Sequence, residues 1–264
     1  MTPTPAMPTR PTQTGKVLDL CALIDRGLVH EIWVYGDADT PGDVSAAEIL
    51  ERKPRYDANR VRLVGEPMDR CDRTIRVAWV NHSRGPGCFL ESLSHGFESV
   101  GTRKPQLIPT LSAEFPAFGN FDLDVKHGTW FPSWYSCPYG EPCLSFPSEG
   151  TVTYDLGTES KTLQGYDPVC GNAHFAPNGK QHYDLQSDAT VQTSCRAFRQ
   201  GGNADGSDAM APFSTADFAA YKTVAPDCMG AFLVWWWQQM PGVGTQAKAS
   251  GGGPMLPWLP FVYY

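Results

Sequence analysis

The chain has 264 residues, 41% hydrophobic and 19% charged, so it can bury a sizeable core and is not disordered by composition. Its formal net charge is −7 and its 21 lysines and arginines are scattered. This argues against a nucleic-acid-binding protein, which needs clustered positive charge. No apolar stretch reaches the ~18 residues of a membrane-spanning helix, and we expect no membrane span.

Three regions are expected along the chain. Residues 1–15 are rich in Pro and Thr and lack a signal-peptide pattern, so we expect a flexible segment outside the fold. Residues 16–250 are expected to form a single α/β domain of the kind that carries catalytic sites. Residues 251–264 begin with GGGP and are expected to form an irregular tail.

The first half of the domain alternates between helix and strand patterns. Apolar spacing predicts a helix over 17–26, and Gly27 is suited to end it. Strands are predicted over 29–35 and 74–81, with a weaker one over 60–64.

The strand 74–81 leads through a Gly-rich loop into a helical pattern over 88–100. Strand, loop and helix in this order are typical of a parallel sheet. We therefore predict a three-layer α/β fold with a mainly parallel central sheet, and a site at the carboxyl ends of its strands.

The second half is less regular. Residues 101–165 are dense in Pro, Gly and aromatic residues, and are expected to form long loops that cover the site, with one strand over Thr151–Asp155. Residues 166–172 are expected to return to the sheet. Ser214 with Asp217 resembles a capping box that opens one helix, and Asp227 is expected to cap a last helix containing three consecutive tryptophans.

The eight cysteines favour disulfides over a zinc site, because their number is even and no CxxC pair occurs. Cys137 and Cys143 bracket a turn-rich segment that a local bridge could close. Cys88 is either bridged, with Cys228 as a candidate partner, or a nucleophile at a strand–loop–helix junction. Disulfides predict an oxidising, extracytoplasmic setting, whereas eight buried thiols would suit a cytosolic protein.

The helix predicted over 88–100 carries the most informative polar pattern. Glu91, His95 and Glu98 stand at i, i+4 and i+7 and therefore share one face, separate from an apolar stripe. Such a face can bind a metal ion or perform acid–base chemistry, and it can also be a solvated face with an ion pair. Neither HExxH nor GxSxG occurs in the chain.

Two neighbouring stretches add candidates to this face. Arg84 and the Gly-Pro-Gly loop present N–H groups at a helix N-terminus, where an anion is favoured. The stretch 170–184 contains His174, Asn178, His182 and Asp184. A histidine from this stretch would complete a His/Glu/His zinc set with one position open for water. All of these residue types also serve as ordinary turn and cap residues.

Several stretches resemble a family of secreted or surface bacterial proteins: DLCALIDRGLVHEIWVYGD, RGPGCFLESLSHGFES, FGNFDLD, GNAHFAPNGKQHYD and APDCMGAFLVWWWQQMPG. The resemblance covers most of residues 17–242, and this chain starts later than such relatives. It implies no particular reaction. It implies only that the polar residues of these stretches belong to family motifs: Glu91, His95, Glu98, His174, Asn178 and Asp184.

The leading hypothesis is a secreted, metal-dependent hydrolase acting on peptide, ester or polysaccharide substrates. His95, Glu98 and His174 would hold a divalent metal, expected to be zinc, and Glu91 would be the general base. Asn178 and Arg84 would stabilise an oxyanion. The expected substrate contacts are Trp130, Trp134, Tyr135, His182 and Asp184.

Two alternatives stay open. One is a metal-free glycoside hydrolase whose carboxyl pair comes from Glu91, Glu98, Asp122 and Asp124. The other is a non-catalytic module that binds carbohydrate or a surface through its aromatic loops.

Overall fold

The computed structural model of the chain describes residues 20–36, 49–50, 76–81, 84–103, 114–115, 117–119, 137, 140–157, 159–242, 244–255 and 257–258. Several sequence predictions fall outside the described residues: segment 1–15, strand 60–64, the carboxylates Asp122 and Asp124, and the aromatic residues Trp130, Trp134 and Tyr135.

The N-terminal part holds a short helix and a small mixed sheet. Helix α1 spans Leu20–Asp25, and Gly27 follows with a φ of 68°, which glycine tolerates best. Strand β1 (Glu31–Gly36) pairs in parallel with β3 (Arg76–Asn81), and β2 (Ile49–Leu50) pairs antiparallel with β3. The two longer strands, β1 and β3, are rich in β-branched and aromatic residues. This composition explains why both were predictable from the sequence.

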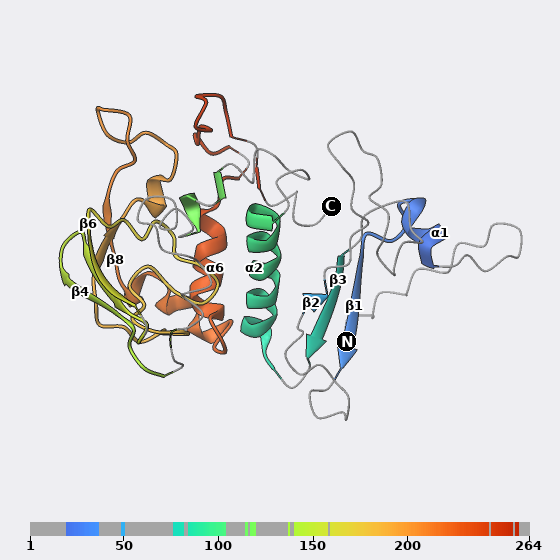
Figure 1. The fold of residues 1–264 in the computed structure, drawn as a ribbon. Coiled ribbons are helices and arrows are strands. Elements are labelled where there is room, and N and C mark those ends of the chain that lie inside the picture. Colours follow the sequence, from blue (N-terminus) through green and yellow to red (C-terminus); the bar gives the residue numbers. More distant parts are fainter. Residues whose placement is uncertain are drawn as a thin grey trace, which may run out of the picture.

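Helix α2 (Pro86–Arg103) runs through the middle of the molecule (Figure 1). It confirms the helix predicted over 88–100, and it begins at a proline, which suits a first helical position because that position needs no N–H donor. The β1–β3 strands lie on one side of α2, and α6 (Gly230–Gln239) packs on the other.

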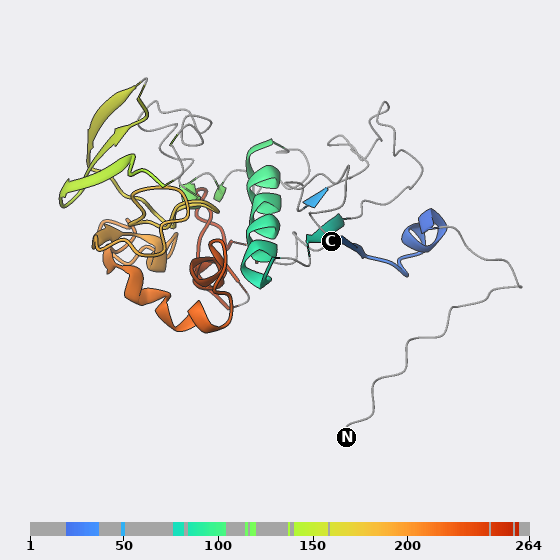
Figure 2. The ribbon, with the colours of Figure 1, turned by 90° about the horizontal axis from the view of Figure 1, so that it is seen from below.

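The region after α2 holds two antiparallel sheets and short helices. The first sheet has the order β4-β5-β6 and lies at the end of the molecule remote from α1 (Figure 2). The second pairs β7 with β8. The bounds are β4 Leu144–Ser148, β5 Thr151–Asp155, β6 Ser160–Gln164, β7 Val191–Thr193, η1 Cys195–Ala197, β8 Ala211–Phe213, η2 Thr215–Asp217 and η3 Ala219–Thr223.

The predicted three-layer α/β fold with a mainly parallel central sheet is wrong. The sheets of the described residues are small and separate, and among them only β1 and β3 pair in parallel. Tight turns make the later strands antiparallel: Glu149 and Gly150 alone join β4 to β5, and Gly150 has a φ of 66°. Residues 166–172, predicted to re-enter the sheet, form no strand.

The capping box predicted at Ser214 and Asp217 is present. It opens the 3₁₀ helix η2, which is followed by a second 3₁₀ helix, η3.

The main core surrounds α6 and is dominated by aromatic rings. Phe232 and Trp236 are fully buried, and the rings of Phe115 and Phe118 lie 6.1 and 5.5 Å from that of Trp236. The described part of the tail beyond residue 250 forms no helix or strand. Trp258 from this tail is nevertheless a core residue, with its ring 5.2 Å from that of Phe118.

Three disulfides among the described residues join parts of the chain from 6 to 140 residues apart. The bridge Cys137–Cys143 confirms a predicted pairing, and Cys88–Cys228 confirms the candidate partner of Cys88 and removes it as a free nucleophile. A third bridge joins Cys170 to Cys195, and none of the cysteines that the structure describes is free. No helix among the described residues is long and apolar enough to span a membrane.

Candidate metal centre

The start of α2 is fixed to the start of α6. The Asp227 carboxylate accepts hydrogen bonds from the backbone N–H groups of Gly87 and Cys88, each at 3.0 Å. A carboxylate is favoured here because these N–H groups have no partner within the helix. Asp227 therefore caps α2, and the prediction that it caps the Trp-rich helix is wrong, since α6 has no side-chain cap.

This cap changes the interpretation of the Gly-Pro-Gly loop. The sequence predicted an anion at this helix N-terminus, and the anion present is the chain's own Asp227. The N–H groups of Gly87 and Cys88 are thus already occupied. Arg84, predicted as an oxyanion donor, is exposed before the first turn of α2.

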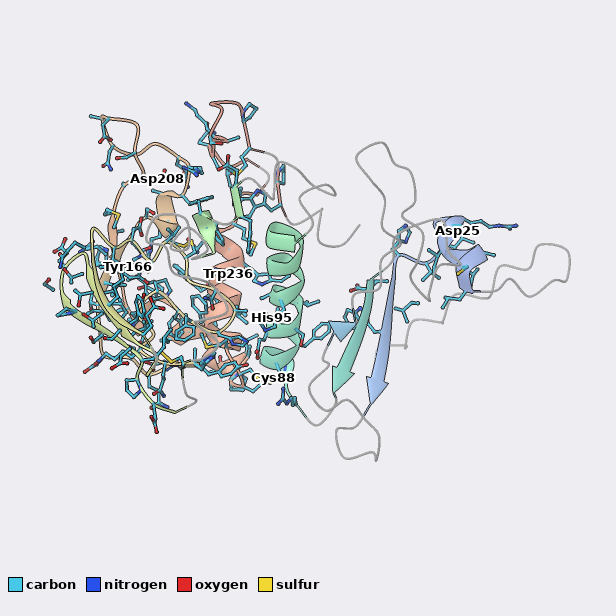
Figure 3. The ribbon with its side chains drawn as sticks, in the orientation of Figure 1. Asp25, Cys88, His95, Tyr166, Asp208 and Trp236 are labelled. Carbon is cyan, nitrogen blue, oxygen red and sulfur yellow. A yellow bond between two sulfur atoms is a disulfide. The ribbon has the colours of Figure 1, made fainter. Side chains whose placement is uncertain are left out.

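Glu91 and His95 lie on adjacent turns of α2, and His95 is on the side of α2 that faces the C-terminal half (Figure 3). Their i, i+4 spacing brings Glu91 Oε1 to 3.7 Å from His95 Nε2. A third side chain, His174, approaches from a loop far along the chain. Its Nε2 atom lies 2.9 Å from His95 Nε2 and 3.3 Å from Glu91 Oε1.

The three atoms have the spacing of a metal-ligand set. Zinc binds histidine nitrogen at about 2.0–2.1 Å, so two ligands of a tetrahedral zinc ion lie about 3.3 Å apart. The three observed separations, 2.9, 3.3 and 3.7 Å, lie around this value. Glu91, His95 and His174 therefore form a group that could hold a metal ion.

The loop that carries His174 is built to hold one conformation. Every residue from 171 to 179 is buried, although the loop forms no helix or strand. The Asn172 side chain accepts hydrogen bonds from the backbone N–H groups of His174 and Phe175 at 2.9 and 3.0 Å. Gly171 has a φ of 70°, and a Cβ atom there would lie 2.2 Å from the carbonyl oxygen of Phe175. The His174 ring is thus presented from a fixed backbone.

Two consecutive residues, His182 and Tyr183, contact the triad formed by Glu91, His95 and His174. His182 is buried, and its Nδ1 atom lies 3.1 Å from His174 Nδ1. The Tyr183 hydroxyl donates to Glu91 Oε1 and lies 3.5 Å from His174 Nε2. His182 and Tyr183 thus add polar contacts to the His174 and Glu91 side chains.

Glu91 is the electrostatic centre of the cluster. Burial alone would raise its pKa, but hydrogen bonds from His174, His95 and Tyr183 outweigh burial and lower the pKa to about 2. Only 5% of its side chain is exposed, and its Oε2 atom has no hydrogen-bond partner. No described lysine or arginine forms an ion pair with Glu91. A buried carboxylate of this kind is the expected partner of a cation.

The remaining predicted site residues lie in other surroundings. Asn178 is fully buried, and its amide donates to Ala189 O at 2.9 Å and to Thr215 Oγ1 at 3.3 Å. Asp184 accepts from the backbone N–H groups of Lys180 and Gln186, as a turn residue does. Glu98 lies in α2, but its side chain is outside the described part of the structure, so its role as a ligand stays a prediction.

The sequence patterns did not indicate Tyr183 as a site residue. The available signal was its place between two selected residues, in the motif His-Tyr-Asp at 182–184. An aromatic residue there was compatible with packing alone, and only the contact with Glu91 shows otherwise. No family model, curated protein or solved structure matches this chain.

Proposed function

We propose that this chain is a metal-dependent hydrolase in which Glu91, His95 and His174 hold one divalent cation, with zinc as the expected metal. The observation that carries the proposal is the convergence of Glu91 Oε1, His95 Nε2 and His174 Nε2 at separations of 2.9 to 3.7 Å. Glu91 thereby takes the carboxylate position that the sequence pattern gave to Glu98.

The donor set favours zinc. Two imidazoles and one carboxylate are typical zinc ligands, and three protein ligands leave one coordination position for water. A zinc ion held by Glu91, His95 and His174 would lower the pKa of a bound water to about 7 and so supply a nucleophile near neutral pH. Such a nucleophile can attack a peptide or ester carbonyl.

The site has one side open to substrate. The His95 side chain is 36% exposed, whereas those of Glu91 and His174 are 5% and 9% exposed. A substrate would therefore approach along the edge of His95. The buried side, at Glu91 and His174, would hold the cation away from bulk water.

The proposal includes an extracytoplasmic location. Three disulfides among the described residues are consistent with an oxidising compartment, where such bridges persist. The resemblance of several motifs to secreted or surface bacterial proteins points the same way.

A glycoside hydrolase that uses Glu91 as its acid fits less well. That role requires a carboxyl group that stays protonated until catalysis, with a raised pKa. The pKa of Glu91 is instead lowered to about 2, the opposite direction to the one that an acid catalyst needs.

The test is the metal content of four proteins after incubation with zinc and removal of the excess: wild type, His95→Ala, Glu91→Gln and His30→Ala. His30 is exposed and outside the cluster, so its variant is the matched control. We expect near-stoichiometric zinc in wild type and His30→Ala, and none in the two cluster variants. Metal-free wild type, or zinc retained by His95→Ala, would contradict the proposal.

Hydrolysis is then assayed with peptide, ester and polysaccharide substrates. Chelation should abolish the activity and zinc should restore it, whereas His95→Ala should be folded and inactive. Activity that survives exhaustive chelation would point to metal-free chemistry instead.

A further inference from the structure

We infer that the dipeptide His182-Tyr183 is the positioning element of this metal site: His182 sets the tautomer of His174, and Tyr183 sets the orientation of the Glu91 carboxylate. The inference rests on the proposed function, because it names what orients the proposed ligands. Neither residue is assigned to bind the metal or the substrate.

His182 acts through the far nitrogen of His174. A histidine that binds a cation through Nε2 carries its proton on Nδ1, and that N–H needs an acceptor. His174 Nδ1 lies 3.1 Å from His182 Nδ1, which can accept a hydrogen bond from this N–H. His182 is 3% exposed, so water does not readily replace it as the acceptor. With a cation bound, the contact thus favours the His174 tautomer whose Nε2 lone pair faces the ion held with Glu91 and His95.

Tyr183 acts on the carboxylate. Its hydroxyl donates to Glu91 Oε1, while Glu91 Oε2 is buried and has no hydrogen-bond partner. One oxygen is therefore held by the phenol, and the carboxylate plane is fixed. Because an oxygen has two lone pairs, Oε1 can accept from Tyr183 and still face the two imidazoles.

The backbone of the dipeptide shows that this placement is imposed by the fold. Tyr183 has a φ of 57°, a conformation that is uncommon for a residue with a side chain. The Tyr183 N–H donates to His174 O at 3.0 Å, which ties the dipeptide to the residue that it orients. The rings of Tyr183 and His174 lie 5.0 Å apart, so the phenol packs along the imidazole. Such conformations persist where surrounding contacts fix them, and they cluster at functional sites.

The experiment measures zinc affinity by competition with a chromophoric chelator for wild type, Tyr183→Phe, His182→Leu and His182→Gln. Tyr183→Phe keeps the ring and removes only the hydroxyl. His182→Leu removes the acceptor, whereas His182→Gln retains one. Tyr221→Phe is the matched control, because the Tyr221 hydroxyl donates to Gln238, outside the cluster.

We expect zinc affinity to fall by about 10- to 100-fold in Tyr183→Phe and in His182→Leu, the range usual for residues that orient metal ligands. His182→Gln should recover part of the loss, and Tyr221→Phe should bind as wild type does. The ¹⁵N shifts of the His174 ring in the zinc-loaded protein should show protonated Nδ1 in wild type. A purely structural role would alter the melting temperature without altering the affinity of the folded protein.

The two proposals fail in different ways. Wild type that binds zinc, with Tyr183→Phe and His182→Leu binding it equally well, would overturn this inference and leave the metal site standing. Wild type that binds no zinc would overturn both. If His182→Leu does not fold, the comparison of Tyr183→Phe with Tyr221→Phe still decides the role of the phenol, and His182→Gln decides that of the imidazole.

Discussion

Glu91 combines features that rarely occur together in one carboxylate of a folded protein. It is buried, ionised, hydrogen-bonded on one oxygen and without a partner on the other. Two histidines and one tyrosine supply its described polar contacts, and no described lysine or arginine forms an ion pair with it. A cation at this point would compensate the charge, which is why the proposed function centres on this residue.

The lowered pKa of Glu91 has a consequence for stability. A carboxyl group whose pKa is lower in the folded state stabilises the fold above its unfolded pKa, and this stabilisation is lost as the pH falls through the folded pKa. The ordinary pKa of a glutamate is 4.5 and that of Glu91 in the fold is about 2, so the loss should occur between these pH values.

We therefore expect the free energy of unfolding of the metal-free wild type to fall more steeply between pH 4.5 and about 2 than that of Glu91→Gln. Denaturant unfolding at a series of pH values measures this slope. Glu141→Gln, at an exposed position, is the control and should keep the wild-type slope. Parallel curves for wild type and Glu91→Gln would show that Glu91 is not ionised as described.

The local part of the site was predictable from the sequence, and the distant part was not. Glu91 and His95 share a helix face because helical periodicity is local. His174 lies 79 residues further along the chain from His95, so its approach depends on the path of the buried loop. The sequence named His174 as a candidate from its polar surroundings, whereas Tyr183 became visible only through its contact with Glu91.

At the scale of elements, the crossing of α2 and α6 positions the cluster. The helices meet so closely at their first turns that a Cβ atom on Gly230 would lie 2.4 Å from Gly87 Cα. Further along the crossing, the Trp237 indole N–H donates to Ser94 Oγ at 2.9 Å. Ser94 immediately precedes His95, so this hydrogen bond fixes α2 next to the proposed ligand.

Gly230→Ala should destabilise the fold by about 1–3 kcal/mol, because an added methyl group in a tightly packed contact forces the backbones apart. The new Cβ would also lie 2.6 Å from Ala225 Cβ, so the added methyl group would clash with two neighbours at once. Denaturant unfolding measures the change. Gly251→Ala, where a Cβ meets nothing within 4 Å, is the matched control. Equal stability of the two variants would contradict the close crossing.

At the scale of the whole molecule, one disulfide connects the parts that make the site. Cys88 and Cys228 are 140 residues apart, and their bridge joins the first turn of α2 to the start of α6. The small local bridge between Cys137 and Cys143 spans only 6 residues. A bridge that closes a longer loop restricts the unfolded chain more, so the two bridges should differ in their contribution.

Replacing Cys88 and Cys228 together by alanine should lower the free energy of unfolding by about 2–5 kcal/mol. The Cys137→Ala, Cys143→Ala double variant, which opens the shorter loop, should lose less. Both are compared by denaturant unfolding under non-reducing conditions. A larger loss in the short-loop variant would contradict the argument from loop length.

The sequence by itself determined the local features: helix α2 with Glu91 and His95 on one face, strands β1, β3 and β5, the capping box at Ser214, and the short bridge between Cys137 and Cys143. These follow from periodicity, side-chain propensity and short loop closure, which act over a few residues.

Only the tertiary structure decided the sheet arrangement, the use of Asp227 as the cap of α2, and the meeting of His174, His182 and Tyr183 with Glu91. Each of these depends on packing between segments that lie far apart in sequence. A buried carboxylate or helix N-terminus takes whichever partner the fold brings within hydrogen-bond distance, and a local pattern does not specify that partner.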